Sequence, residues 1–178
     1  RRKSGFEPKL YKFYSYDEQN KKWVFNKDVF ERFSEEKKIN VDSSKTPLIL
    51  FMNSYENEVK TINSSFINSL YPNLDKDNPD EIFVYALSDR SLTMLNFIVD
   101  FHNAEKASIK PIFLLLHIPK SKENYSKIRL IVTQIYSFLS LICDFNVVVL
   151  NKNHYLDQVE FVKSILKING KLENKKET

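Results

Sequence analysis

The feature that most constrains this chain is a set of four short, continuously apolar runs that alternate with segments of helical spacing. The runs lie at residues 48–52, 82–87, 112–116 and 147–150. Helical spacing of apolar residues is found at 59–70, 92–102, 128–142 and 159–166. Continuous apolarity is typical of strands buried on both faces, as in a parallel sheet covered by helices. The alternation therefore predicts an α/β fold with right-handed crossovers.

The N-terminal region has a different pattern. Residues 10–16 and 22–25 are rich in aromatic side chains and flank a polar run, which predicts a β-hairpin. Asp28 then precedes Val29 and Phe30, as expected at the start of a short capped helix. The whole pattern predicts a three-layer α/β fold with a mostly parallel sheet of four or five strands flanked by helices. The hairpin and the short helix are expected to be appended to it.

The domain organisation follows from these patterns. We expect residues 1–46 to form the hairpin and short helix, packing on the body of the protein or on a partner. Residues 47–168 are expected to form one Rossmann-like α/β domain, which matches a chain of 178 residues. Residues 169–178 are dominated by charged side chains and are predicted to be a flexible tail.

The rarest residue types exclude several kinds of chemistry. The only glycines, Gly5 and Gly170, lie in the end segments of the chain. Phosphate-binding loops and nucleophile elbows require glycine, so the rest of the chain cannot contain either motif. The single cysteine, Cys143, excludes an intramolecular disulfide and a cysteine-rich zinc site, and it favours an intracellular location. The three histidines are far apart in the sequence and make a weak case for a metal site. We therefore predict no cofactor and no metal.

The uncharged stretch at residues 130–143, which no other stretch exceeds in length, is shorter than the roughly 17 residues that a membrane span needs. We therefore expect no transmembrane segment. The chain begins with two arginines and a lysine and carries a net charge of +4. A removed N-terminal anchor or presequence would fit this start, and it would make a mitochondrial or other organellar location an alternative.

Four residues that follow the expected strands could carry chemistry. They are Asp89, His117, Lys120 and His154. Ligands of open parallel sheets bind at the carboxyl ends of the strands, where an acid–base or phosphate-binding group would form. Polar residues at these positions also cap the next helix. Cys143 at a helix C-terminus lacks the surroundings that activate a thiol, so we expect it to be a small core residue. We predict no catalytic site.

The order of elements over residues 47–168 resembles that of the Ras-like small GTPases. In that family the first strand leads to a loop with Gly, four residues, Gly, Lys and Ser or Thr, whose backbone N–H groups hold phosphates. Here the Lys60-Thr61 pair and the helical pattern around it are similar to the family's motif. The resemblance implies a related α/β topology and places the family's phosphate site at this loop.

The residues that carry the family's chemistry are replaced. Ser54 and Val59 stand where the glycines are needed, and Glu56 and Glu58 would face the phosphates. The family's Asp-x-x-Gly switch is absent, and the strand expected at 112–116 does not lead to the guanine-reading Asn-Lys-x-Asp. The chain thus resembles a GTPase domain that has lost its nucleotide motifs, and we expect it to bind no nucleotide.

The chain has more apolar side chains than its core should need, which indicates an interaction surface. Aromatic residues make up 13% of the chain, and the helix expected at 128–142 is apolar almost all round, although a helix on a sheet needs only one apolar stripe. The excess predicts a surface that meets another protein. The candidate interface residues are Tyr136, Phe138, Leu141, Tyr14 and Trp23.

The pattern favours a non-catalytic protein-interaction or scaffolding subunit of a larger assembly. Two alternatives stay open. In the first, the aromatic hairpin with its lysines binds RNA by stacking bases and neutralising phosphates. In the second, the chain is an enzyme with a site at the carboxyl edge of the sheet.

Overall fold

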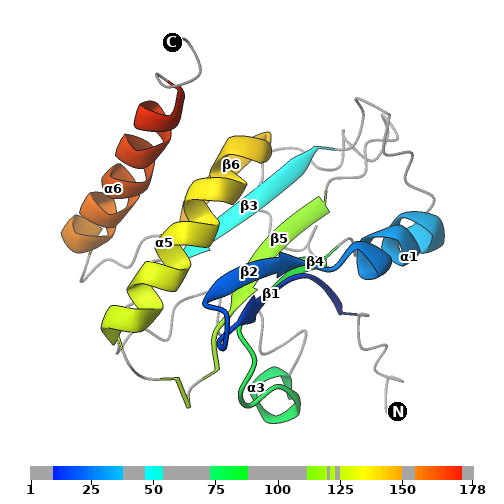
Figure 1. Ribbon diagram of the computed structural model, residues 1–178. Coiled ribbons are helices and arrows are strands. Elements are labelled where there is room, and N and C mark those ends of the chain that lie inside the picture. Colours follow the sequence, from blue (N-terminus) through cyan, green and yellow to red (C-terminus); the bar gives the residue numbers. More distant parts are fainter. Residues whose placement is uncertain are drawn as a thin grey trace, which may run out of the picture. The chain divides into compact units, whose positions relative to one another are not determined.

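The computed structural model describes residues 10–37, 47–53, 73–87, 112–119, 121–122, 125–149 and 155–173. The fold is mixed α/β, and the predicted class is confirmed (Figure 1). The strands are β1 (Tyr11–Asp17), β2 (Lys22–Phe25), β3 (Leu48–Asn53), β4 (Phe83–Leu87), β5 (Ile112–His117) and β6 (Phe145–Val149). The helices within the described ranges are α1 (Lys27–Lys37), α3 (Leu74–Asp77), α5 (Tyr125–Ile142) and α6 (Tyr155–Glu173). Each of the four continuously apolar runs overlaps a strand, as predicted.

The chain divides into two compact units. The first unit comprises residues 1–49 and 81–118, and the second comprises residues 50–80 and 119–178. The domain boundaries expected from the sequence stay a prediction, because residues 38–46 lie outside the described part of the chain. The helices expected at 59–70 and 92–102 also lie outside it.

The sheet of the first unit has the strand order β2-β1-β4-β5, and every pair in it is antiparallel. In the β4–β5 pair, Phe83 lies opposite His117 and Leu87 lies opposite Phe113. The mostly parallel sheet expected from the sequence is therefore wrong for these four strands. The physical reason lies in β4, which is paired on both edges and buried on both faces, so it carries the continuous apolarity that parallel strands show.

The predicted hairpin is confirmed, but it is not an appendage. β1 lies between β2 and β4, so the hairpin is part of the sheet. The turn is closed by Asp17, whose carboxylate accepts the backbone N–H groups of Gln19 and Asn20 at 3.0 Å. After β2, the side-chain amide of Asn26 donates to the Lys12 carbonyl at 2.9 Å. These hydrogen bonds fix both ends of β2 against β1.

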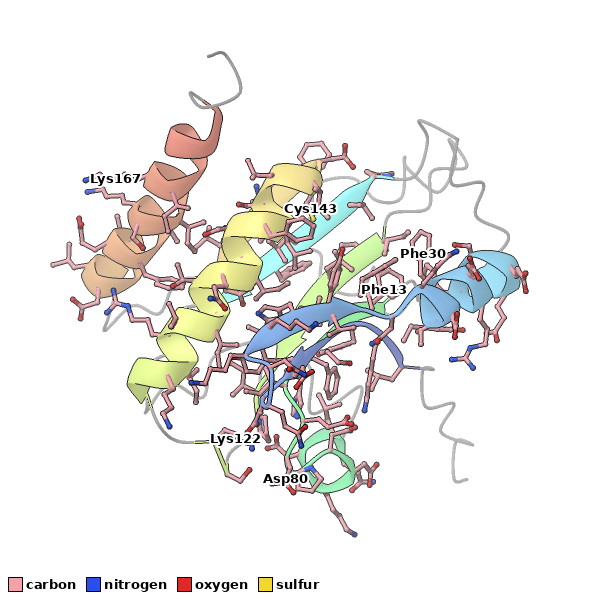
Figure 2. All side chains as sticks on the ribbon, viewed as in Figure 1. Phe13, Phe30, Asp80, Lys122, Cys143 and Lys167 are labelled. Carbon is pink, nitrogen blue, oxygen red and sulfur yellow. The ribbon has the colours of Figure 1, made fainter. Side chains whose placement is uncertain are left out.

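Helix α1 packs on β1 through aromatic rings. The Tyr11 ring lies 4.8 Å from the Phe33 ring, and the Phe13 ring lies 5.1 Å from it, in both cases edge to face. Phe13 also faces Phe30 at 5.4 Å, as the two labelled side chains in Figure 2 show. The short helix predicted from the sequence is confirmed as α1. Its Phe33 side chain is fully buried, so the aromatic face of α1 anchors the helix in the first unit.

The second unit contains α3, α5, α6, β6 and most of β3. β6 neighbours β3, and the predicted helix over 128–142 is confirmed as part of α5. The buried residues of α5 include Ile128, Ile131, Val132, Ile135 and Leu139. α6 packs on α5 with the Phe161 ring 6.4 Å from the Tyr136 ring. α6 continues through Gly170 to Glu173, so the first residues of the predicted tail are helical, and residues 174–178 lie outside the described part.

None of the helices within the described ranges is both long and apolar enough to cross a membrane.

Candidate functional site

The second unit carries exposed apolar side chains where α5 ends and β6 begins. Four large side chains within eight residues, Phe138, Leu141, Ile142 and Phe145, are each 44–61% exposed. Phe138 lies three and four residues before Leu141 and Ile142, so these side chains share one side of the last two turns. Leu130 extends the same side two turns earlier and is also exposed. We call the first four residues the α5–β6 surface.

Local hydrogen bonds hold the α5–β6 surface in place. The Cys143 N–H donates to the Leu139 carbonyl at 2.9 Å and continues the helical pattern by one residue. The side-chain amide of Asn146 donates back to the Ser140 carbonyl at 3.3 Å. This bond brings the start of β6 next to the last turn of α5.

Cys143 lies at the junction of α5 and β6, as its label in Figure 2 shows, but unlike the side chains of the α5–β6 surface it is not exposed. It is a buried free thiol. Burial, with a smaller effect of the neighbouring Asp144 charge, raises the pKa of the thiol to about 12. A thiol in this state is a poor nucleophile at neutral pH, in agreement with the core role expected for it.

The first unit presents a second group of apolar side chains, on one face of the β1–β2 hairpin. Tyr14 lies opposite Phe25 with ring centroids 5.2 Å apart, and Tyr16 lies opposite Trp23 at 5.4 Å. Residues two apart in a strand point to the same side, so all four rings share one face. We call Tyr14, Tyr16, Trp23 and Phe25 the aromatic strip. Phe30 from α1 continues the strip, 5.7 Å from Phe25.

The charges around the aromatic strip are balanced. Asp17 and Glu18 follow Tyr16, and Lys21 and Lys22 precede Trp23. Burial raises the pKa of Tyr16, and the Glu18 and Asp17 charges raise it further. The pKa of Asp17 is lowered mainly by its hydrogen bonds from Asn20, with a smaller effect of the Lys22 charge. The tip of the hairpin therefore has no basic surplus.

The interface residues predicted from sequence fall on both units. Phe138 and Leu141 belong to the α5–β6 surface, and Tyr14 and Trp23 belong to the aromatic strip, where both are half-buried. Tyr136 differs from them, because it is only 1% exposed and packs on Phe161. Its side chain faces α6, so the exposed residues among the three candidates on α5 are Phe138 and Leu141.

The four residues considered for catalysis are not shown together. Asp89, Lys120 and His154 lie outside the described residues. His117 is the last residue of β5, is 5% exposed, and its ring lies 4.8 Å from the Phe83 ring. Because β4 and β5 are antiparallel, their carboxyl ends lie at opposite ends of the pair. Within the described ranges, no group of three or more His, Cys, Asp or Glu side chains could hold a metal ion.

Sequence reasoning missed half of each surface. Ile142 was expected in the buried stripe of its helix, and the strand with Phe145 was expected to start only at residue 147; both side chains are exposed. Tyr16 and Phe25 belong to the hairpin aromatics that could stack RNA bases, but they are not among the predicted protein-interface residues. The alternation of the two strands around Tyr14 and Trp23 is the signal that would have found them.

Searches of protein-family models, of curated proteins and of solved structures gave no match to this chain.

Proposed function

We propose that the chain is a non-catalytic protein-interaction or scaffolding subunit of a larger assembly, and that it docks a partner protein through the α5–β6 surface. The observation that carries the proposal is the exposure of Phe138, Leu141, Ile142 and Phe145 within eight residues. Contiguous exposed apolar side chains mark protein interaction sites more often than single ones do.

Energetics support this proposal. Full burial of a large apolar side chain is worth roughly 1.5–3 kcal/mol, and each of the four side chains keeps about half of its surface in contact with water. A partner that covers them would gain on the order of several kcal/mol from this surface. Among the described strands, β6 also stands at the end of the strand order, so a strand edge adjoins the surface.

The non-catalytic part of the proposal is supported by the geometry of β4 and β5. An enzyme of the kind considered from sequence would need polar side chains from neighbouring strand ends to meet at one edge. The antiparallel pairing directs those ends apart. The RNA-binding alternative rests on the hairpin, and it is disfavoured by the two acids that balance the two lysines at its tip.

The test compares complex size for variants of the tagged full chain produced in its own cells. Leu141→Asp and Phe145→Asp place a charge on the α5–β6 surface, where a partner would have to desolvate it. We expect wild-type chain to elute in native gel filtration well above the 21.1 kDa of the monomer, and both variants to shift towards the monomer.

Leu166→Asp is the matched control, because Leu166 is a leucine on α6 outside the surface that is at least as exposed as Leu141. It should keep the wild-type elution. Circular dichroism and melting temperature of the purified variants must match those of the wild type. If folded Leu141→Asp and Phe145→Asp chains elute with the wild type, the surface is not the docking site and the proposal fails.

A further inference from the structure

We propose that β6 pairs with the β6 strand of a second copy of this chain, antiparallel and around a two-fold axis, so that the purified protein is a dimer. The inference goes beyond the proposed function, because it concerns the backbone edge of a strand and names the occupant of that edge. It does not depend on the α5–β6 surface as a docking site, although Phe145 belongs to both the surface and the strand.

The position of β6 determines the chemistry of its occupant. Among the described strands, β6 stands at one end of the strand order and has β3 as its neighbour. A strand at the end of a sheet carries a row of N–H and C=O groups along its outer edge, and this row is a template for pairing with another chain. The complement of the edge is therefore an extended backbone, which a second strand supplies.

β6 lacks the features that protect strand edges from pairing. Its five residues, Phe-Asn-Val-Val-Val, contain neither a charge nor a proline. Proteins usually protect an edge with a lysine, a proline or a very short strand. β2, at the other end of the strand order, has two such features, because it is four residues long and starts with Lys22. The difference favours β6 as the edge that is covered in the assembled protein.

The side chains of β6 fit a second copy of the same strand. Neighbouring residues of a strand point to opposite faces, so Val147 and Val148 lie on different faces, and both are half-buried. A strand added beside them would cover more of both valines. In an antiparallel pair centred on Val147, each Val147 lies opposite its own copy and each Asn146 lies opposite Val148. Uncharged and β-branched residues therefore meet across the axis, as is typical of stable strand pairs.

The nearest charge favours the antiparallel direction. Asp144 directly precedes β6 and is exposed. In a parallel, in-register pair the two Asp144 carboxylates would lie side by side and repel each other. In the antiparallel pair centred on Val147 they lie at opposite ends of the paired strands, about 20 Å apart at 3.4 Å per residue. This separation exceeds the Debye length of about 8 Å at physiological salt, so their repulsion is screened.

The first experiment measures the mass of the purified full-length protein by sedimentation equilibrium. We expect twice the 21.1 kDa of the monomer, falling to the monomer mass on dilution. In an antiparallel pair, one of two neighbouring residues points its N–H to the outer edge, so Val147→Pro and Val148→Pro remove one outward and one inward donor. The variant that loses the outward N–H should keep its fold and become monomeric, because proline is tolerated on the open side of an edge strand. Val147→Ile and Val148→Ile keep the N–H groups and should stay dimeric.

The second experiment locates the two-fold axis by disulfide formation between copies. Cysteine replaces each of residues 145–148 in turn, in a Cys143→Ala background, and the proteins are mildly oxidised. A residue on the axis has its Cα about 5 Å from that of its own copy, which a disulfide can bridge. A residue two positions away is about 14 Å from its copy and cannot be bridged. We expect one position to give a crosslinked dimer, and the position two residues away to give none.

The outcomes separate this proposal from the proposed function. Leu141→Asp changes the α5–β6 surface but leaves β6 as it is, so this variant should stay dimeric even where it loses its partner in cells. A monomeric mass of the wild type at high micromolar concentration overturns the proposal. So does a dimer that persists in both proline variants with unchanged circular dichroism. If both proline variants unfold, the cysteine series decides, and equal crosslinking at all four positions would contradict the antiparallel pair.

Discussion

At the scale of single residues, long-range partners decide what the side chains do. The sequence predicts that Tyr11 and Phe13 lie in a strand, because aromatic and polar residues alternate there. It does not reveal that the Tyr11 hydroxyl donates to Glu36 at 2.5 Å, since the two residues are 25 positions apart and belong to different elements. The burial of Cys143, by contrast, was expected from its place at the end of an apolar helix and is confirmed.

The Tyr11–Glu36 hydrogen bond predicts a loss of stability at high pH. Burial and the Glu36 carboxylate raise the pKa of Tyr11 to about 12, above the value near 10 of an unfolded tyrosine. A raised folded-state pKa contributes stability that is complete below pH 10 and is lost as the pH rises towards 12. Tyr11→Phe should lower the free energy of unfolding at pH 8 by about 1–2 kcal/mol. In this variant the free energy of unfolding should also fall less steeply between pH 10 and 12 than in the wild type, as measured by urea unfolding. An unchanged slope in this variant would contradict the assignment.

The burial of Cys143 predicts that its thiol is alkylated slowly in the native protein. Because burial raises the pKa of its thiol, we expect iodoacetamide to label the native protein at pH 8 far more slowly than it labels the urea-unfolded chain. Asp144→Asn should change the native rate little, since burial is the larger cause. Rapid labelling of the native wild type would show that the junction between α5 and β6 is open.

At the scale of elements, apolar patterns predicted where strands and helices occur better than how they pair. β4 reads as a continuous apolar run, and the 88–111 stretch before β5 is long enough for a crossover helix, so a parallel pair was expected. The pair is antiparallel, because a central strand with both faces covered has the same apolar pattern in either direction. Pairing depends on contacts between distant segments, which periodicity does not encode.

Helix α5 offers a direct test of its two faces. Leu139 is fully buried, whereas Leu130 is the most exposed large apolar residue of the same helix. Leu139→Ala should lower the free energy of unfolding by about 2–5 kcal/mol, the usual cost of a large-to-small change in a core. Leu130→Ala should change it by less than about 0.5 kcal/mol, since surface substitutions have small effects. Equal losses in the two variants would mean that the exposed side of α5 is covered within the chain.

At the scale of the whole molecule, the sheet of the first unit depends on the β1–β2 hairpin. The sequence suggested an appendage, yet β1 supplies the antiparallel neighbour of β4. A chain that starts at residue 27 would lose β1 and β2, expose the edge of β4, and remove the buried Tyr11 and Phe13 from the core. We expect this truncation to unfold the first unit, seen as loss of slow amide exchange in β4 and β5. Retained protection in those strands would restore the appendage interpretation.

The interaction role of the α5–β6 surface is tested most directly by photocrosslinking in cells that produce the full chain. A benzophenone amino acid replaces Phe138 in one experiment and Leu166, on α6, in the other. Both positions are exposed and both accept an aromatic side chain at the surface. We predict that position 138 crosslinks efficiently to one defined protein, that the crosslink disappears when Phe145→Asp is added, and that position 166 gives no such product. Equal, diffuse crosslinking from both positions, unaffected by Phe145→Asp, would contradict the account.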